Sequence, residues 1–177
     1  MTILNYINEN ESNKEELRNY INENHIFEVL IKNNVYNLRD IQKEAIEKGL
    51  FFKKNFLVCA PSGSGKTIIG ELAIANNYFT NSGKGVYLVP YKAIAAEKFK
   101  YFKKNYAKYG LNVVLSIGDS EIDEKEIINA DIVITTFEKL DSLIRNFKLK
   151  NNWLHLITTI VIDEIHILGD EYRGFKL

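Results

Sequence analysis

Residues 56–67 read FLVCAPSGSGKT, and the fold class is predicted from this stretch first. Its first part, Phe56 to Ala60, is a short continuous apolar run, which is typical of a strand buried on both faces. A glycine-rich turn follows, and the apolar spacing after it predicts a helix over about 66–78. A strand, a glycine-rich turn and a helix in this order make the first unit of an α/β fold.

The same unit recurs toward the C-terminus. Apolar runs predict further strands at 85–89, 112–116, 131–135 and 159–163. Helices are predicted after the Pro90 turn, to about Tyr109, and from Phe137. This alternation implies right-handed crossovers and a mostly parallel sheet with helices on both faces. The predicted fold class is therefore α/β, doubly wound, with ligands bound beyond the carboxyl ends of the strands.

The segment from Ala60 to Thr67 matches the phosphate-binding loop, except that Ala60 stands where the pattern has its first glycine. Phosphates need convergent backbone N–H donors, and Gly63 and Gly65 let the chain curl so that these donors meet at the positive end of the next helix. A chance match by a glycine-rich turn is expected in about one chain in a hundred. We expect Lys66 to reach the outer phosphates and Thr67 to hold Mg²⁺. The predicted ATP and Mg²⁺ ligands are Ser62, Gly63, Ser64, Gly65, Lys66 and Thr67.

Two carboxylates, Asp163 and Glu164, follow directly on the apolar run 160–162. Burying them without partners would be costly. We expect Asp163 to bind the shell of the metal ion and Glu164 to polarise the water that attacks the γ-phosphate. Without the phosphate loop, a capped loop with solvated acids would be the better interpretation. The two motifs together favour ATP hydrolysis, with Lys66, Asp163 and Glu164 as catalytic residues.

The motif sequence resembles that of superfamily 2 helicases. Residues 163–166 read DEIH, which resembles the DExH box, and DEYRG at 170–174 resembles its continuation in the Ski-two-like branch, which includes Hjm-type DNA repair helicases and related RNA helicases. Upstream, LRDIQ at 38–42 resembles the Q motif, whose glutamine, here Gln42, would bind the adenine edge. The alternative for Gln42 is a solvated side chain on a helix. The resemblance implies a RecA-like first lobe of an ATP-dependent helicase that unwinds in the 3′-to-5′ direction.

Two further segments resemble motifs that hold the backbone of one nucleic-acid strand. Residues 89–98 resemble motif Ia and residues 135–145 resemble motif Ib. Such a motor uses hydroxyls, helix starts and single cations on phosphates, so Lys92 and Thr136 are the candidate contacts, and a solvated lysine is the alternative for Lys92. The resemblance also places a small loop, Gly118-Asp119-Ser120, near nucleic acid. It assigns His166 to coupling ATP hydrolysis to strand movement through a Ser-Ala-Thr motif, which this sequence does not contain.

Lysines and aromatic residues alternate along the predicted helix 91–109. A basic stripe with stacking aromatics would bind single strands. We favour the simpler interpretation, in which the aromatics lie partly in the core and the lysines lie in solvent.

The expected domains are an N-terminal helical extension, residues 1–34, packed on a RecA-like ATP-binding lobe, residues 35–177. In the extension, apolar spacing predicts two short helices between Asn13 and Lys32, and the same spacing predicts a third helix, from Leu38 to Leu50, at the start of the lobe. By the resemblance, the lobe lacks the strand with the Ser-Ala-Thr motif, so a gap is expected between the strand before Lys66 and the strand ending at Asp163. The second RecA-like lobe is also missing, and we expect little hydrolysis by these residues alone.

Composition indicates the class of protein and its expected cellular compartment, but it does not indicate the function. Of the 177 residues, 46% are hydrophobic and 26% charged, which suits one globular domain with a sizeable core. Lysine plus arginine equals aspartate plus glutamate at 23 each, so net charge does not indicate a nucleic-acid partner. The lone Cys59 is expected to be a small buried core residue. Without a membrane-length apolar run or a signal pattern, we expect a cytoplasmic protein with no membrane partner.

Three classes of function stay open at this point. The favoured one is the helicase lobe, acting on single-stranded or partly duplex nucleic acid, with DNA preferred over RNA. Another kind of phosphate-loop NTPase does not explain the ordered Q-like, Ia-like and Ib-like segments. A non-enzymatic module that binds nucleotide or nucleic acid beside a separate lobe remains the other alternative.

Overall fold

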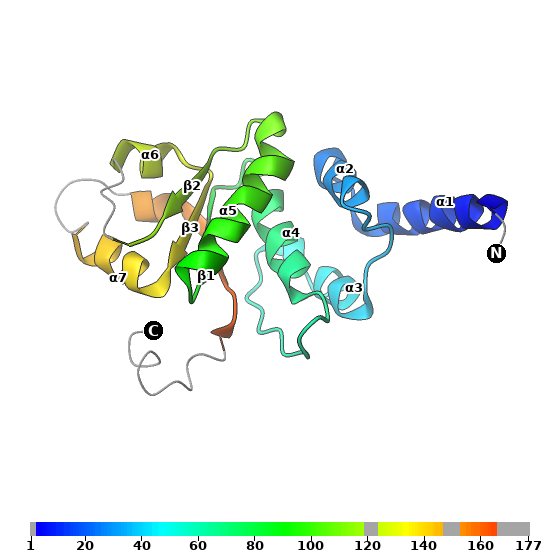
Figure 1. Ribbon diagram of the computed structural model, residues 1–177, viewed down its shortest axis with the longest axis horizontal. Helices are drawn as coiled ribbons and strands as arrows, with labels where there is room; N and C mark the ends of the chain where they lie inside the picture. Colours follow the sequence, from blue (N-terminus) through cyan, green and yellow to red (C-terminus); the bar gives the residue numbers. More distant parts are fainter. Residues whose placement is uncertain (1–2, 119–123, 147–152, 166–177) are drawn as a thin grey trace. The chain divides into compact units, whose positions relative to one another are not determined.

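The computed structural model describes residues 3–118, 124–146 and 153–165 (Figure 1). The chain forms two compact units, residues 1–79 and 80–177. The domain division expected at residue 34 stays a prediction. No helix among the described residues is long and apolar enough to cross a membrane.

The first unit is helical. It contains α1 (Ile3–Tyr20), α2 (Asn24–Lys32), α3 (Asp40–Glu47), the short 3-10 helix η1 (Leu50–Phe52) and α4 (Lys66–Phe79). The Glu23 carboxylate accepts a hydrogen bond from the Ile26 N–H at 2.7 Å and so caps the start of α2. Apolar side chains from all four α-helices and the connecting segments form its buried core: Leu17, Ile21, Ile26, Val29, Leu30, Leu38, Ala45, Ile69, Leu72, Ile74 and Ala75. The helices expected before Leu50 and after Lys66 are therefore present.

The segment before α4 differs from the prediction. Residues 54–61 form neither helix nor strand, so the strand predicted at Phe56 to Ala60 is wrong. Side chains alternate between half-buried and exposed along it, with Leu57 73% exposed. Cys59 is exposed, so its assignment to the core is also wrong. An apolar run reports a preference for burial, whereas a strand also needs a hydrogen-bonded neighbour, and no described segment pairs with this one.

The second unit is a parallel α/β layer. Its strands are β1 (Lys84–Val89), β2 (Val113–Ser116), β3 (Ile132–Thr136) and β4 (Ile157–Ile162), in the order β2-β3-β1-β4. Every strand pair is parallel, with Val86 opposite Val133 and Val133 opposite Val114. The helices among its described residues are α5 (Lys92–Tyr106), η2 (Ala107–Tyr109), α6 (Glu124–Asn129), α7 (Phe137–Asn146) and η4 (Trp153–Leu156). The α/β class with a parallel sheet is confirmed.

Helices cover both faces of this sheet (Figure 1). Tyr87 of β1 points to α5, where its ring centroid lies 5.8 Å from that of Phe102. The neighbouring residues Val86 and Leu88 face the other way, because side chains alternate along a strand. They belong to a cluster of apolar residues from the strands, α6 and the residue after it, α7 and η4: Val86, Leu88, Ile127, Ala130, Val133, Phe137 and Trp153.

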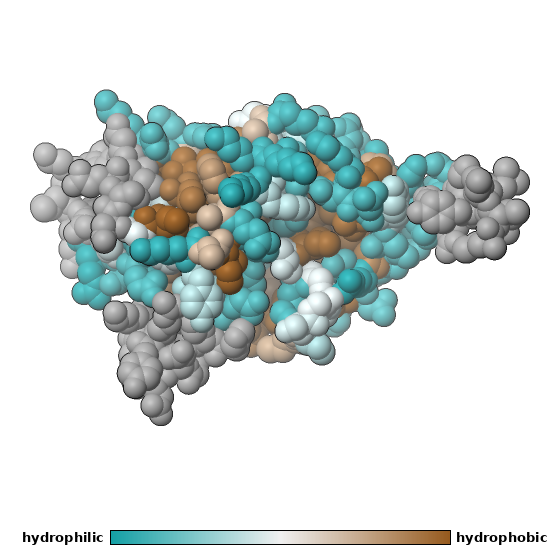
Figure 2. All heavy atoms as spheres, in the orientation of Figure 1, coloured by the Kyte–Doolittle hydropathy of each residue, from teal (hydrophilic) through white to brown (hydrophobic). Residues whose placement is uncertain are grey.

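The helix α5 bears out the simpler interpretation of its lysines and aromatics. Phe102 and Tyr106 are fully buried, whereas hydrophilic side chains cover the outer face of the helix (Figure 2). The exposed lysines are Lys92, Lys100, Lys103 and Lys104 in α5 and Lys108 in the adjoining η2. Lys98 is the exception, since only 16% of its side chain is exposed.

The strand β4 lies at one edge of the described sheet and pairs there with β1 alone. Its register with Val86 and Leu88 places Ile160 and Ile162 on the same face as the apolar cluster. These two side chains are nevertheless 54% and 43% exposed. The gap expected beside this strand stays a prediction.

Candidate functional site

The phosphate-type loop, residues 60–67, is the segment that matches the phosphate-binding pattern, and its shape depends on two glycines in the left-handed region. Gly63 has φ 75° and Gly65 has φ 92°, which side-chain-bearing residues rarely adopt. Between them, the Ser64 N–H donates to the Pro61 carbonyl at 3.3 Å. The helix α4 begins directly afterwards at Lys66, so the loop ends on the N-terminus of a 14-residue helix.

The ammonium group of Lys66 lies over the start of this loop. It donates to the carbonyl oxygens of Ala60 at 2.6 Å and Pro61 at 3.0 Å. Phosphate oxygens carry charge and are stronger acceptors than neutral carbonyls. A triphosphate in the loop would therefore compete well for Lys66.

One observation fits a phosphate anion at this loop. The Ser64 hydroxyl is buried and has no hydrogen-bond partner among the described residues, in a loop that ends on a helix N-terminus. Mg²⁺ is typically held by one or two carboxylates together with waters and substrate phosphates. Among the described residues there is no group of three or more metal-binding side chains.

The Q-like segment is attached to the loop by side chains. Gln42 is only 1% exposed; its Oε1 accepts from the Arg39 N–H at 2.9 Å, and its Nε2 donates to the Gly65 carbonyl at 3.0 Å. The Arg39 guanidinium donates to the Gly63 carbonyl. The interpretation of Gln42 as a solvated residue is therefore wrong. Binding adenine would require Gln42 to exchange one of these hydrogen bonds.

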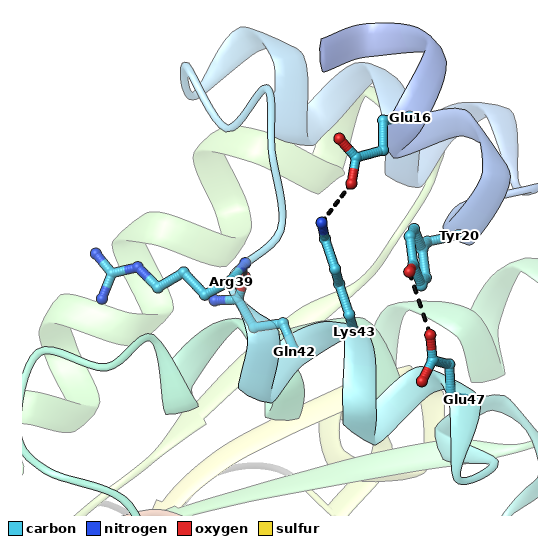
Figure 3. A network of polar contacts seen from close by, with 6 residues as sticks. All are labelled: Glu16, Tyr20, Arg39, Gln42, Lys43 and Glu47. Atoms are coloured by element: carbon cyan, nitrogen blue, oxygen red, sulfur yellow. Dashed lines mark hydrogen bonds and ion pairs between the residues drawn. The ribbon is translucent and has the colours of Figure 1, made fainter.

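Two side-chain pairs connect the N-terminal helix α1 to α3, the helix that carries Gln42 (Figure 3). Lys43 forms an ion pair with Glu16, and the Tyr20 hydroxyl donates to Glu47 at 3.2 Å. The Lys43 ammonium also lies 5.6 Å from the centre of the Tyr20 ring. The hydrogen bond to Glu16 raises the pKa of Lys43, and partial burial, followed by the Glu47 contact, raises the pKa of Tyr20.

These shifts predict a loss of stability at alkaline pH. A group whose pKa is raised on folding stabilises the folded state at any pH below its unfolded-state pKa, which is near 10 for both groups. This stabilisation is lost as the pH rises through the folded-state pKa. We expect the free energy of unfolding, from denaturant titrations between about pH 8 and pH 11, to fall more steeply above about pH 10 in the wild type than in Glu16→Gln. Glu44→Gln, which removes an exposed pair with Lys48, is the control and should keep the wild-type profile. Identical profiles for the wild type and Glu16→Gln would contradict the assignment.

The carboxylate Asp163 is held by three groups of the second unit. Its Oδ1 accepts from the Glu164 N–H at 3.0 Å. Its Oδ2 accepts from the Tyr87 hydroxyl at 2.9 Å and lies 3.9 Å from the Lys98 ammonium. The exposed Glu164 has φ 58°, an unfavourable backbone conformation that concentrates at functional sites.

Sequence reasoning missed Tyr87 and Lys98. The signal for Tyr87 is register: it pairs with Val161, two residues before Asp163, so all three side chains lie on one face. Lys98 is one of several lysines in α5, and nothing in the sequence distinguishes it.

The candidate nucleic-acid contacts have different accessibilities. Lys92 is exposed at the start of α5, and a Cβ on Gly118 would lie 3.1 Å from its ammonium group, so the motif Ia lysine and the Gly118 loop are neighbours. Thr136 pairs with Val89 at the carboxyl end of β3 but is only 4% exposed. Its hydroxyl is therefore not available as a surface contact in this structure. Asp119, Ser120, His166 and the segment 170–174 lie outside the described residues.

Comparisons with known proteins match most of the chain. The DEAD/DEAH box helicase family matches residues 39–177. The chain is 45% identical over 158 residues to the ATP-dependent DNA helicase Hel308 of Methanocaldococcus jannaschii, covering 86% of the chain and 13% of the relative. Identity to the Hel308 protein of Methanococcus vannielii is 48% over 146 residues, which cover 79% of the chain and 19% of the relative. Identity to the Hel308 protein of Pyrococcus horikoshii is 42% over 152 residues, which cover 86% of the chain and 21% of the relative. The chain thus spans about a fifth or less of the length of these relatives.

Proposed function

Because the chain belongs to the DEAD/DEAH box helicase family, we propose that it binds ATP with Mg²⁺ and serves as the first motor lobe of an ATP-dependent DNA helicase. The observation that carries the proposal is the geometry of the phosphate-type loop. Gly63 and Gly65 are left-handed just before α4, and the Lys66 ammonium donates to the Ala60 carbonyl at the start of the loop. Relatives named as DNA helicases, 42–48% identical, support DNA over RNA.

The proposed roles follow from the chemistry of each side chain. Lys66 and the loop N–H groups would bind the phosphates, and Thr67 and Asp163 would each serve as a ligand in the shell of the metal ion. Bound Mg²⁺ would neutralise charge on the β- and γ-phosphates. Glu164 orients the attacking water and accepts its proton. Gln42 binds the adenine edge after giving up one of its present hydrogen bonds.

We propose that full turnover needs a second RecA-like lobe. Arginines supplied across the cleft raise phosphoryl-transfer rates by orders of magnitude. The described chain is therefore expected to bind ATP without hydrolysing it quickly. By the family resemblance, His166 would couple the site to strand movement.

The nucleic-acid part of the proposal rests on Lys92, which is exposed beside the Gly118 loop. Strand gripping through phosphates is independent of base sequence and depends on salt. Thr136 is a weaker candidate because its side chain is buried.

Replacing Lys92 by alanine tests this part. We expect Lys92→Ala to weaken single-stranded DNA binding by a similar factor for oligonucleotides of different sequence and to reduce the salt slope by about 0.7. Fluorescence anisotropy at several salt concentrations measures both quantities. Lys100→Ala removes an exposed lysine of the same helix and is the control. If the two variants behave alike, Lys92 is an ordinary surface lysine; if the wild type shows no DNA binding, the chain is better described as a nucleotide-binding module.

A further inference from the structure

We propose that Tyr87 is a positioning residue for Asp163 and that Lys98 is the counter-ion with which a bound metal ion competes. The inference rests on the proposed function, because Asp163 matters here as a ligand in the Mg²⁺ shell. It assigns a role to two residues outside the recognised nucleotide motifs. It also accounts for the one lysine of α5 that does not lie in solvent.

Tyr87 is rigidly placed. It is 1% exposed in β1, between two neighbouring strands, and its backbone pairs with Ile134 and Val161. Its ring makes an edge contact with Phe102 at 5.8 Å and has the Lys98 ammonium 5.8 Å from its centre. A phenol fixed in this way presents its hydroxyl in one direction only.

The hydroxyl is directed at the carboxylate. It donates to Oδ2 at 2.9 Å, while the backbone N–H of Glu164 donates to Oδ1 at 3.0 Å. Hydrogen bonds to both oxygens fix the plane of the carboxyl group. Each carboxylate oxygen accepts about two hydrogen bonds, so lone pairs remain for metal-bound water. The arrangement resembles the hydrogen-bonded partners that orient metal ligands in other proteins.

Lys98 acts through charge. Its ammonium lies 3.9 Å from Oδ2, and both side chains are only 16% exposed, so this pair is less screened than a surface pair. The cation neutralises Asp163 but repels a second cation at the same carboxylate. Removing Lys98 should therefore strengthen Mg²⁺ binding, whereas removing the Tyr87 hydroxyl should weaken it.

The opposite signs separate this proposal from a purely structural role. If the two residues merely attached β4 to β1 and α5, both substitutions would lower stability and weaken the site in the same direction. The measurement is binding of a fluorescent ATP analogue to the 177-residue chain across a Mg²⁺ titration, with a metal-free series in chelator. Thermal unfolding is followed in parallel.

For Tyr87→Phe we expect the Mg²⁺ concentration at half-maximal enhancement of binding to rise about tenfold, with metal-free nucleotide binding unchanged. For Lys98→Met we expect that concentration to fall several-fold. Lys100→Met, which changes an exposed lysine of the same helix, should leave it unchanged. The effect of Tyr87→Phe should disappear in an Asp163→Asn background, since there is then no carboxylate to position.

The outcomes also separate this inference from the proposed function. If Asp163→Asn alone leaves the Mg²⁺ dependence intact, the metal-binding role of Asp163 fails. If Asp163→Asn weakens the Mg²⁺ dependence while Tyr87→Phe has no effect, only the positioning role is overturned. The same holds if the effect of Tyr87→Phe is equally large with and without the Asp163→Asn substitution. Should Tyr87→Phe not fold, Lys98→Met decides, because a rise in its half-maximal Mg²⁺ concentration contradicts the counter-ion role.

Discussion

Replacing Lys66 by alanine is expected to lower the affinity for ATP about 10- to 100-fold. The ammonium lies over the loop, where it now donates to two carbonyl oxygens. A hydrogen bond between charged groups is worth about 1.5–3 kcal/mol, and each 1.4 kcal/mol is tenfold in affinity. Calorimetric titration of ATP with Mg²⁺ into both proteins measures the change.

The control for this substitution is another lysine of the same unit. Lys48→Ala removes a side chain that is 66% exposed and forms a surface pair with the exposed Glu44, so ATP affinity should not change. Equal ATP affinity in Lys66→Ala and the wild type would show that the loop is not a phosphate site.

Alanine at Gly65 is expected to abolish ATP binding and to destabilise the first unit, whereas alanine at Gly63 has the milder effect. Both glycines are left-handed, at φ 92° and 75°, so either alanine costs about 1–2 kcal/mol of backbone strain. At Gly65 the added Cβ would also lie 2.3 Å from Gln42 Nε2, but at Gly63 it would meet nothing within 4 Å. Displacing the buried Gln42 amide breaks its bond to the Gly65 carbonyl and adds about 1–3 kcal/mol.

Denaturant titration and ATP binding of the two alanine variants make a matched comparison. The Gly65 variant should lose more unfolding free energy than the Gly63 variant, by at least about 1 kcal/mol. Equal losses would mean that Gln42 does not pack on the loop as the structure has it.

The sequence predicted the parallel sheet well because its strands are apolar and alternate with helices. The residues of β1, β2, β3 and β4 were located to within about two positions, as is usual for element boundaries. The segment from Phe56 to Ala60 was mistaken for a strand because hydrophobicity does not reveal whether a hydrogen-bonding neighbour exists. The wrong assignment of Cys59 to the core has the same cause, because Cys59 lies in this segment and is exposed.

The site was predictable where a motif dictates local geometry. Gly63 and Gly65 have the positive φ angles that the loop pattern requires. Contacts between distant segments were not predictable: Gln42 bonds to the loop 23 residues away, and Tyr87 reaches Asp163 across 76 residues. No periodicity encodes such pairs, since they depend on how strands and helices are brought together.

The most direct test of an ATP site at this loop is the backbone amide NMR spectrum of the isotope-labelled chain during titration with ATP and Mg²⁺. We predict that the largest shifts fall on the amides of residues 62–67, with further shifts at Asp163 and Glu164. Binding that shifts other amides and leaves 62–67 unchanged would contradict the account.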